Sequence, residues 1–211
     1  MKDIILCILF LIISYLLGSI PFGLLLSKAH GIDLRTKGSG NIGSTNAFRV
    51  LGVKLGLFAA LFDVAKGSVI ILLVRLLIDL GAYNNPLFND SNFFYIIYGL
   101  PAVIGHCFSV YLKFKGGKGV ATSLGVALAS YPLLALLIMT VFIIVVIITK
   151  YVSLASTIAA ITTTTFAFIF FPLYYHDFII PIGILLMTIL IMIQHIPNYK
   201  RLINHNENKI F

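Results

Sequence analysis

Long unbroken runs of apolar residues constrain this chain more than any other feature of its sequence. They cover residues 4–26, 55–80, 93–112, 132–149, 152–171 and 178–195. Each run is long enough to cross the hydrocarbon core of a bilayer as a helix, whereas membrane strands would show alternation over about 10 residues. The sequence therefore predicts an all-α integral membrane protein.

The composition supports this prediction. Hydrophobic residues make up 60% of the 211 positions and charged residues 10%, against about 45–50% and about 25% in soluble domains. A soluble enzyme, a disordered chain and a disulfide-stabilised scaffold are therefore excluded. Cys7 and Cys107 lie in apolar runs without the spacing of metal ligands, so we expect two small buried hydrophobes and no metal site.

The first apolar run is too long for the core of a signal peptide and lacks a cleavage site of small residues, so we expect it to span the membrane. It ends in Gly-Ser-Ile-Pro-Phe-Gly at 18–23. Proline removes a backbone donor and glycine weakens the helix, so the chain should bend here.

The basic residues indicate which loops face the cytoplasm. They gather in the first loop, after the third run and in the tail, and stretches 76–112 and 151–199 contain none. The three groups are Lys28, Arg35, Lys37, Arg49 and Lys54, then Lys113, Lys115 and Lys118, and finally Lys200, Arg201 and Lys209. The positive-inside rule places all three in the cytoplasm, with the N-terminus outside.

Six spans conflict with that orientation, because an even number returns the tail to the side of the N-terminus. The apolar segment 119–131 is too short for an ordinary span, but it supplies the missing crossing. We therefore expect residues 1–211 to form a single multi-pass domain. Its fold is a polytopic bundle of about seven transmembrane helices, one of them short, with the N-terminus outside and the C-terminus cytoplasmic.

The first loop contains Gly38, Gly40 and Gly43 in a G-x-G-x-x-G pattern. A dinucleotide site requires a strand before this pattern, whereas here a membrane helix precedes it. Glycine nevertheless lets backbone N–H groups face an anion, and Ser, Thr, Asn and Arg add donors. The loop predicts an anion site; the alternative is a solvated basic loop.

The second loop, Lys115 to Gly119, reads Lys-Gly-Gly-Lys-Gly and runs into the short helix. It lacks the pattern of a nucleotide-binding P-loop, so no nucleotide site is predicted. Free N–H groups, a helix N-terminus and Lys118 together favour an oxyanion. The alternative is a tight turn with interfacial lysines.

Two further groups are candidates. Asp63 and Lys66 are three residues apart within a span, so they share a helix face; they form either an ion pair that supports the first loop or part of the chemistry. His195 stands at the end of the last run, before Asn198 and basic residues. It could complete an anion pocket or act as a base, although a lone histidine is more often structural.

Taken in order, these motifs resemble the PlsY family of bacterial acyl-phosphate:glycerol-3-phosphate acyltransferases. The resemblance rests on Ser39-Gly40-Asn41 with Arg49, on Gly105-His106 with the second loop, and on His195-x-x-Asn198-x-x-Arg201. It extends over essentially the whole chain. Ser44, Gln194, Tyr199 and His205-Asn206 depart from the family pattern, and the last pair leaves the geometry of the tail around Glu207 open.

The resemblance implies transfer of a fatty acyl group from acyl phosphate to the 1-hydroxyl of sn-glycerol 3-phosphate. The products are lysophosphatidic acid and phosphate, in the first acylation step of bacterial phospholipid synthesis. It further implies a monomer in the cell inner membrane with a cytoplasmic active site. No cofactor or nucleic acid is expected, and the partners are membrane lipid and an enzyme that produces acyl phosphate.

Residue roles also follow from the resemblance. The implied catalytic residues are Ser39, Asn41, Lys118, His195 and Asn198. The implied substrate-binding residues are Gly43, Thr45, Asn46, Arg49, His106, Lys115, Gly116, Gly117, Ser153 and Glu207. No carboxylate stands out as a general base, which suits the family proposal that a substrate phosphate takes the hydroxyl proton.

Two rival functions remain. A transporter for an organic phosphate would carry broken segments in two related halves, and no internal repeat is evident. An acyl-CoA enzyme with a His-x4-Asp dyad would need Asp five residues after a histidine, and none of the five histidines has one.

Overall fold

The computed structural model describes residues 1–86, 95–176 and 178–210. The helices are α1 (Lys2–Ser19), α2 (Phe22–Ala29), α3 (Ser44–Asp79), α4 (Tyr95–Cys107), α5 (Val120–Ser130), α6 (Pro132–Thr149), α7 (Val152–Tyr175) and α8 (Ile179–Ile203). Two 3-10 turns, η1 (Leu34–Thr36) and η2 (Val110–Leu112), lie in the loops. The described residues contain no strand, which confirms the all-α prediction.

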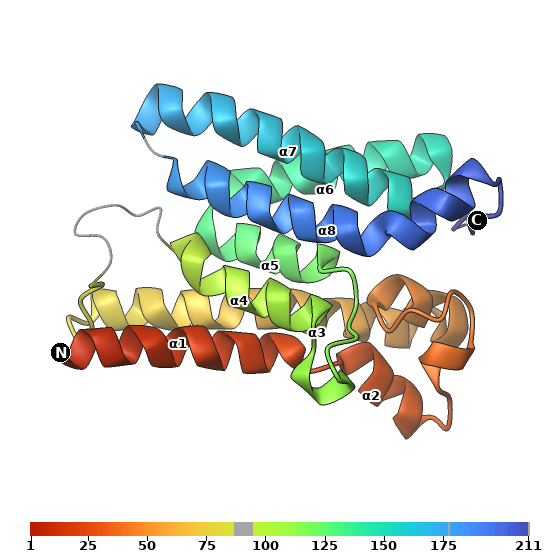
Figure 1. Ribbon diagram of the computed structural model, residues 1–211, viewed down its shortest axis with the longest axis horizontal. Helices are drawn as coiled ribbons and strands as arrows, with labels where there is room; N and C mark the ends of the chain where they lie inside the picture. The colour runs from red at the N-terminus through yellow and green to blue at the C-terminus, as the bar shows by residue number, and fades with distance from the viewer. Residues whose placement is uncertain (87–94, 177, 211) are drawn as a thin grey trace.

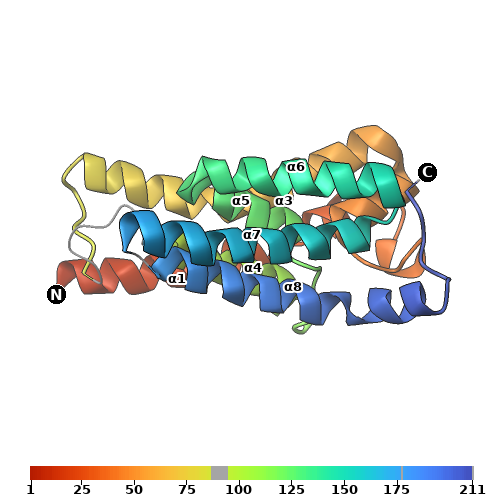
Figure 2. The same cartoon turned by 90° about the horizontal axis from the view of Figure 1, so that it is seen from above.

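The long helices lie side by side along the long axis of the molecule, α2 lies at a slant to them, and the two termini lie at opposite ends (Figures 1 and 2). Six helical segments in the described part of the chain are long and apolar enough to span a membrane, and α5 is a shorter apolar helix of 11 residues. This confirms the prediction of a helical bundle with one short member. The predicted start of the third span, Phe93, lies outside the described residues.

The predicted bend in the first run is confirmed. α1 ends at Ser19, the chain passes through Ile20 and Pro21 in non-helical conformations, and α2 begins at Phe22. Two other boundaries differ from expectation. α3 begins at Ser44 rather than near residue 55, with a kink at Gly52, and α8 continues to Ile203, so His195 lies inside a helix rather than at its end.

Glycines bring α3 and α5 into close contact. A Cβ on Gly125 would lie 1.9 Å from the carbonyl oxygen of Val64, and one on Gly67 would lie 2.1 Å from that of Thr122. Only residues without a side chain allow backbones to approach so closely, which is how helices commonly associate in membranes. This contact fixes the short helix beside the first half of the bundle.

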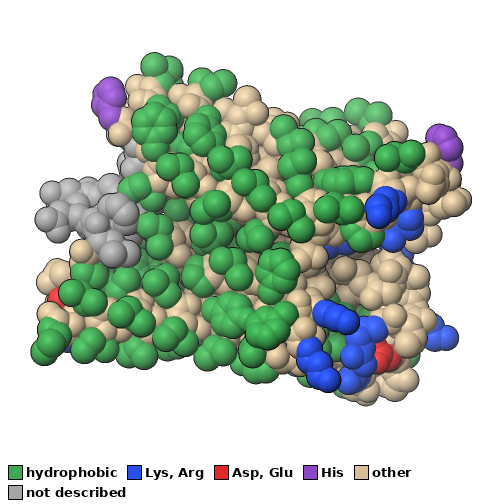
Figure 3. Space-filling model, viewed as in Figure 1, with side chains coloured by type: hydrophobic (Ala, Val, Ile, Leu, Met, Phe, Trp, Pro, Cys, Tyr) green, Lys and Arg blue, Asp and Glu red, His purple; other side chains and the backbone are tan. Residues whose placement is uncertain are grey.

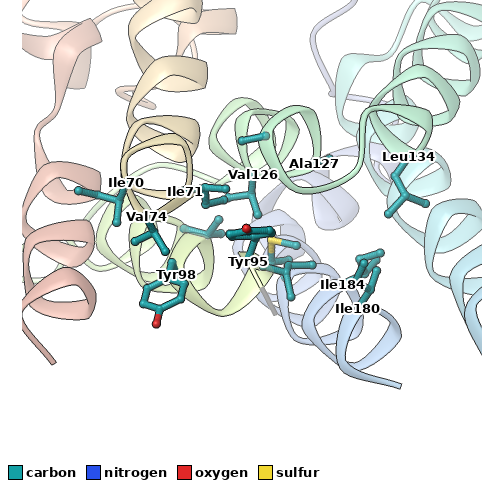
Figure 4. Close-up of a cluster of buried hydrophobic side chains, with 14 of the residues drawn as sticks. Ile70, Ile71, Val74, Tyr95, Tyr98, Val126, Ala127, Leu134, Ile180 and Ile184 are labelled. Atoms are coloured by element: carbon teal, nitrogen blue, oxygen red, sulfur yellow. The ribbon is translucent and has the colours of Figure 1, made fainter. Parts of the chain in front are cut away.

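Buried side chains from α3, α4, α5, α6 and α8 meet in the interior, among them Ile71, Tyr98, Val126 and Ile180 (Figure 4). The face in Figure 3 is largely apolar, and Lys and Arg side chains gather at the end where α2 and the C-terminus lie. This separation of charge from apolar surface matches a protein whose middle faces lipid.

Candidate active site

A cavity of about 410 Å³ opens at the charged end of the bundle. Its lining joins all three predicted motifs. Ser39, Asn41, Gly43, Thr45, Asn46 and Arg49 come from the first loop and the start of α3, His106 and Lys118 from the end of α4 and the second loop, and Ser153, His195, Asn198 and Glu207 from α7, α8 and the tail. Three predicted residues, Lys115, Gly116 and Gly117, lie outside the described lining.

Asn46 holds the first loop in shape. Its side-chain nitrogen donates to the carbonyls of Leu34, Lys37 and Asn41 at 2.8–3.1 Å, and its Oδ1 accepts from the N–H of Ser39 at 2.9 Å. Asn46 is 2% exposed. Asn46 therefore shapes the loop that carries Ser39 and Asn41, and it also borders the cavity.

The first turn of α3 also borders the cavity. Gly43 precedes the helix, its carbonyl accepts from the N–H groups of Asn46 and Ala47, and its own N–H donates to Asn41 Oδ1 at 2.8 Å. A helix N-terminus presents unpaired N–H groups and the positive end of the helix dipole. The glycine pattern therefore leads into a helix start suited to an anion, without a nucleotide-binding strand.

The second loop differs from expectation in one respect. The N–H of Gly116 donates to Cys107 O at 3.0 Å and that of Gly117 donates to His106 O at 2.8 Å, so neither is free for a ligand. The two glycines are needed for packing, because a Cβ on Gly117 would lie 2.1 Å from Nε2 of His106. The two glycines hold the loop against the end of α4. Lys118 is then the lysine of this loop that lines the cavity.

The Lys118 side chain forms no hydrogen bond or ion pair with the described residues, and it lines the cavity. Burial lowers its pKa to about 8; the charges of Arg201 and Arg49 act in the same direction, and that of Glu207 opposes them. In these surroundings the charged form of Lys118 is stabilised when it pairs with an anion.

The α8 residues share one helix face, because His195, Asn198 and Arg201 are spaced three apart. Nδ1 of His195 lies 2.8 Å from the carbonyl oxygen of Ile191. A carbonyl only accepts, so Nδ1 carries the proton and the Nε2 of the neutral ring has a free lone pair. Asn198 Oδ1 is buried without a hydrogen-bond partner among the described residues.

Glu207 connects α7, α8 and the tail. Its carboxylate accepts from Asn198 Nδ2 at 2.6 Å, Ser153 Oγ at 2.9 Å and Arg201 Nε at 2.8 Å. Burial alone acts to raise its pKa, but these three hydrogen bonds hold the pKa of Glu207 below its usual value. Despite the His205-Asn206 departure, Glu207 reaches the site.

The tail beyond Glu207 closes over the cavity, which the sequence does not indicate. Asn208 O accepts from Arg49 Nη2 at 3.0 Å, and the N–H of Ile210 donates to Lys150 O at 2.9 Å. Ile210 also lines the cavity. The chain end thus links α3 to the junction of α6 and α7.

Apolar side chains complete the wall. They come from α3, α5 and α6: Ala60, Val64, Val120, Leu124, Ile138, Met139 and Phe142. Sequence analysis missed the α6 residues, because α6 is apolar around its whole circumference and gives no sign of which side faces a ligand. The cavity thus combines anion-binding groups with a hydrocarbon-like surface.

The Asp63–Lys66 pair is present, with Lys66 Nζ 2.8 Å from Asp63 Oδ1. Among the described residues its polar partners do not include the first loop, although Asp63 borders the same cavity as Ser39 and Asn41. Lys66 donates to the carbonyl of Ile20, and the ring of His106 lies 3.5 Å from Asp63. The pair therefore joins the α1–α2 break to the end of α4.

Comparison with known proteins decides the family. The model of the family described as glycerol-3-phosphate acyltransferase matches residues 8–205. The chain belongs to this family. A glycerol-3-phosphate acyltransferase of Bartonella henselae is 44% identical over 203 residues, covering 96% of this chain and 90% of the relative, and one of Bacillus subtilis is 41% identical, covering 96% of each.

Solved structures of the family have the same fold. The crystal structure of PlsY (YgiH), an integral membrane glycerol 3-phosphate acyltransferase in its glycerol 3-phosphate form, is 35% identical and superimposes with a TM-score of 0.82, covering 96% of this chain and 94% of that one. The lysophosphatidic acid form gives a TM-score of 0.80 at 34% identity. This chain is therefore a multi-pass membrane protein of the PlsY family of acyltransferases.

Proposed function

We propose that this acyltransferase uses acyl phosphate as its donor and glycerol 3-phosphate as its acceptor, and that it releases lysophosphatidic acid and phosphate. One observation carries the proposal: a single cavity joins Lys118, Arg49 and a helix N-terminus to an apolar wall. Both substrates are phosphate anions, and the donor also has a long hydrocarbon chain. The related structures named for glycerol 3-phosphate and lysophosphatidic acid support the acceptor and the product.

In the proposed reaction the 1-hydroxyl oxygen of glycerol 3-phosphate attacks the acyl carbonyl carbon. The new C–O ester bond forms, the bond from that carbon to the phosphate oxygen breaks, and a substrate phosphate takes the hydroxyl proton. Nε2 of His195 accepts a hydrogen bond from the 2-hydroxyl and so orients glycerol 3-phosphate, which leaves the proton of the attacking 1-hydroxyl to the phosphate. Because acyl phosphate already has a good leaving group, positioning and anion stabilisation supply the catalysis.

We assign the anion-binding roles to residues from each motif. Ser39, Asn41 and Lys118 donate to phosphate or to the developing oxyanion. Arg49 and Thr45 hold phosphate at the start of α3, and Asn198 is kept in place by Glu207 and Ser153. Asn46 and His106 act by shaping the two loops.

We further propose that the protein works as a monomer in the inner membrane, with the cavity on the cytoplasmic side. The concentration of basic residues at the cavity end supports this orientation. We also propose that a separate enzyme supplies the acyl phosphate.

The test is a donor comparison with purified protein. Glycerol 3-phosphate with palmitoyl phosphate should release inorganic phosphate and lysophosphatidic acid in equal amounts, without added metal or nucleotide. Palmitoyl-CoA in place of palmitoyl phosphate should give no product. Product formed only from palmitoyl-CoA would refute the donor assignment.

A further inference from the structure

Three ionisable side chains are buried together beneath the second loop. Lys66 Nζ lies 2.8 Å and His106 Nδ1 lies 3.5 Å from the same oxygen, Oδ1 of Asp63. The side chains of Asp63 and Lys66 are each 3% exposed and that of His106 is 6% exposed. Charges within a membrane bundle are costly and usually serve a function, yet the proposed reaction makes no use of Asp63 or Lys66.

His106 holds the second loop from two sides. Its carbonyl accepts the N–H of Gly117 at 2.8 Å. Its ring fills the space beside the Cα of Gly117, since a Cβ there would lie 2.1 Å from Nε2. Gly117, which His106 holds through these two contacts, immediately precedes Lys118. The orientation of the imidazole therefore determines the position of the Lys118 backbone.

Lys66 contributes by balancing charge. An isolated buried carboxylate is strongly unfavourable, whereas a paired one with further hydrogen bonds is tolerated. Lys66 supplies the opposite charge and is itself anchored on the carbonyl of Ile20 at 2.9 Å. Its ammonium also lies 5.9 Å from the centre of the Phe22 ring. Asp63 can therefore remain beside His106 inside the bundle.

We propose that Asp63 is a positioning residue that acts through His106 on the second loop and so places the ammonium group of Lys118 in the cavity. The inference rests on the proposed function only in taking Lys118 as a contact of a substrate phosphate. No group among the described residues forms a hydrogen bond or ion pair with the ammonium of Lys118, so the loop backbone sets its position. Small displacements of such a group are expensive, because a shift of about 1 Å can cost about 10²-fold in rate.

The main variant removes both charges together, as Asp63→Leu with Lys66→Met, so that no unpaired ion is left in the bundle. Replacing a buried ion pair by apolar groups of similar size is often neutral or stabilising. His106→Leu removes the contact from the other side. His106→Asn keeps an N–H donor near the position of Nδ1 and is the conservative comparison.

The measurements are the affinity for glycerol 3-phosphate and for an unreactive acyl phosphonate, together with kcat and KM. We expect the double variant and His106→Leu to weaken at least one affinity and to lower kcat/KM, each by about tenfold or more. His106→Asn should recover part of the loss. Ser14→Ala is the matched control, because it deletes a buried hydrogen bond from α1 to the carbonyl of Tyr98 in α4, away from the second loop; it should leave affinity and kinetics unchanged.

Wild-type affinities and kcat/KM in the folded double variant, or in His106→Leu, would overturn the proposal. If the double variant does not fold, the comparison of His106→Leu with His106→Asn decides, and equal values for the two would contradict it. A wrong donor assignment would appear differently, as a wild-type protein that does not turn over palmitoyl phosphate. The affinity for glycerol 3-phosphate is measured without any donor and is independent of that result.

Discussion

Lys118 carries a positive charge in surroundings that oppose it. Burial and two arginines lower its pKa to about 8, so in the free protein the ammonium form predominates below about pH 8 and is lost above it. An anionic substrate binds the charged form, and kcat/KM reports the protonation state of the free enzyme. We therefore predict that kcat/KM falls as the pH rises through about 8.

Lys118→Arg keeps the charge at all accessible pH values and should remove this alkaline decline, even if its rate at pH 7 is lower. Lys118→Ala should cut kcat/KM by at least about tenfold at pH 7, as expected for loss of a charged oxyanion donor, and this difference from the wild type should narrow as the pH rises through about 8. The measurement is kcat/KM from pH 6 to 9.5. A decline that persists unchanged in Lys118→Arg would assign it to another group.

Glu207 holds the tail to the bundle through three hydrogen bonds, so Glu207→Gln should destabilise the protein by roughly 1–3 kcal/mol. Its pKa is lowered in the folded protein. This stabilisation is therefore complete above the ordinary pKa of 4.5 and is lost as the pH falls through the folded value. Below about pH 4.5 the wild type and the variant should converge.

Thermal unfolding monitored with a thiol-reactive dye measures this effect, because Cys7 and Cys107 are free and buried. Lys209→Ala, in the same tail, is the control, because it removes the contact of that ammonium with the Tyr151 ring and leaves the Glu207 hydrogen bonds in place. A Glu207→Gln protein as stable as the wild type at pH 7 would show that the tail is held by other contacts.

At this scale the sequence indicates which residues gather but not what each one does. Ser39, Asn41, Lys118, His195 and Asn198 all line the cavity, as the three motifs predict. The N–H groups of Gly116 and Gly117 are instead taken by carbonyls at the end of α4, and the amide of Asn46 by the first loop. Backbone and ligand compete for the same donors, and only the folded structure decides between them.

Among the elements, α3 owes its shape to one residue. Gly52 has φ 82° and ψ 176°, a region of backbone space that is essentially restricted to glycine. The kink there redirects the segment that carries Thr45 and Arg49. Sequence analysis placed the start of the span at residue 55 because the preceding segment is polar, and a polar helix cannot be distinguished from a loop by hydropathy.

Gly52→Ala tests this kink without a steric complication, because nothing lies within 4 Å of an added Cβ. The free energy of unfolding should then fall by about 1–3 kcal/mol, because alanine is strained in this backbone conformation. We predict lower thermal stability and a raised KM for glycerol 3-phosphate, since the start of α3 must shift. Ala65→Gly, at an exposed position of the same helix outside the cavity lining, is the control for helix propensity. A variant with wild-type KM would show that the kink does not position the site.

The short helix α5 could be predicted from the positions of the basic residues. With the N-terminus outside and the tail in the cytoplasm, the chain needs an odd number of crossings, and the other apolar runs supply six. The contact of α5 with α3 could not be predicted, because the glycines at 67 and 125 match only once the helices are placed in register. α8 was predicted too short because the apolar run stops at His195, yet the helix continues through Pro197 to Ile203.

For the whole molecule, we predict an orientation in the membrane with the N-terminus outside and the cavity in the cytoplasm. The test uses single cysteines in a background with Cys7→Ala and Cys107→Ala. They replace Lys28, Lys115 or His205, which are all exposed. They should react with a membrane-impermeant maleimide in inverted vesicles and not in intact cells. A cysteine at Asn84, at the opposite end, should show the reverse. Labelling of any of the first three in intact cells would contradict the proposed topology.

The cavity as a whole was only half predictable. Its polar lining comes from motifs that the sequence displays, whereas its apolar wall uses α6 residues such as Ile138 and Phe142 that resemble every lipid-facing neighbour. The return of the tail to Arg49 and Lys150 depends on backbone contacts that leave no trace in the residue pattern.

The most direct test is a structure of this protein with glycerol 3-phosphate and an unreactive acyl phosphonate bound together. We predict both phosphorus groups in the one cavity, with donors from the first loop or α3, from Lys118 and from α8 within hydrogen-bond distance. The alkyl chain should lie along α5 and α6. Phosphate groups bound away from any one of these three segments would contradict the account.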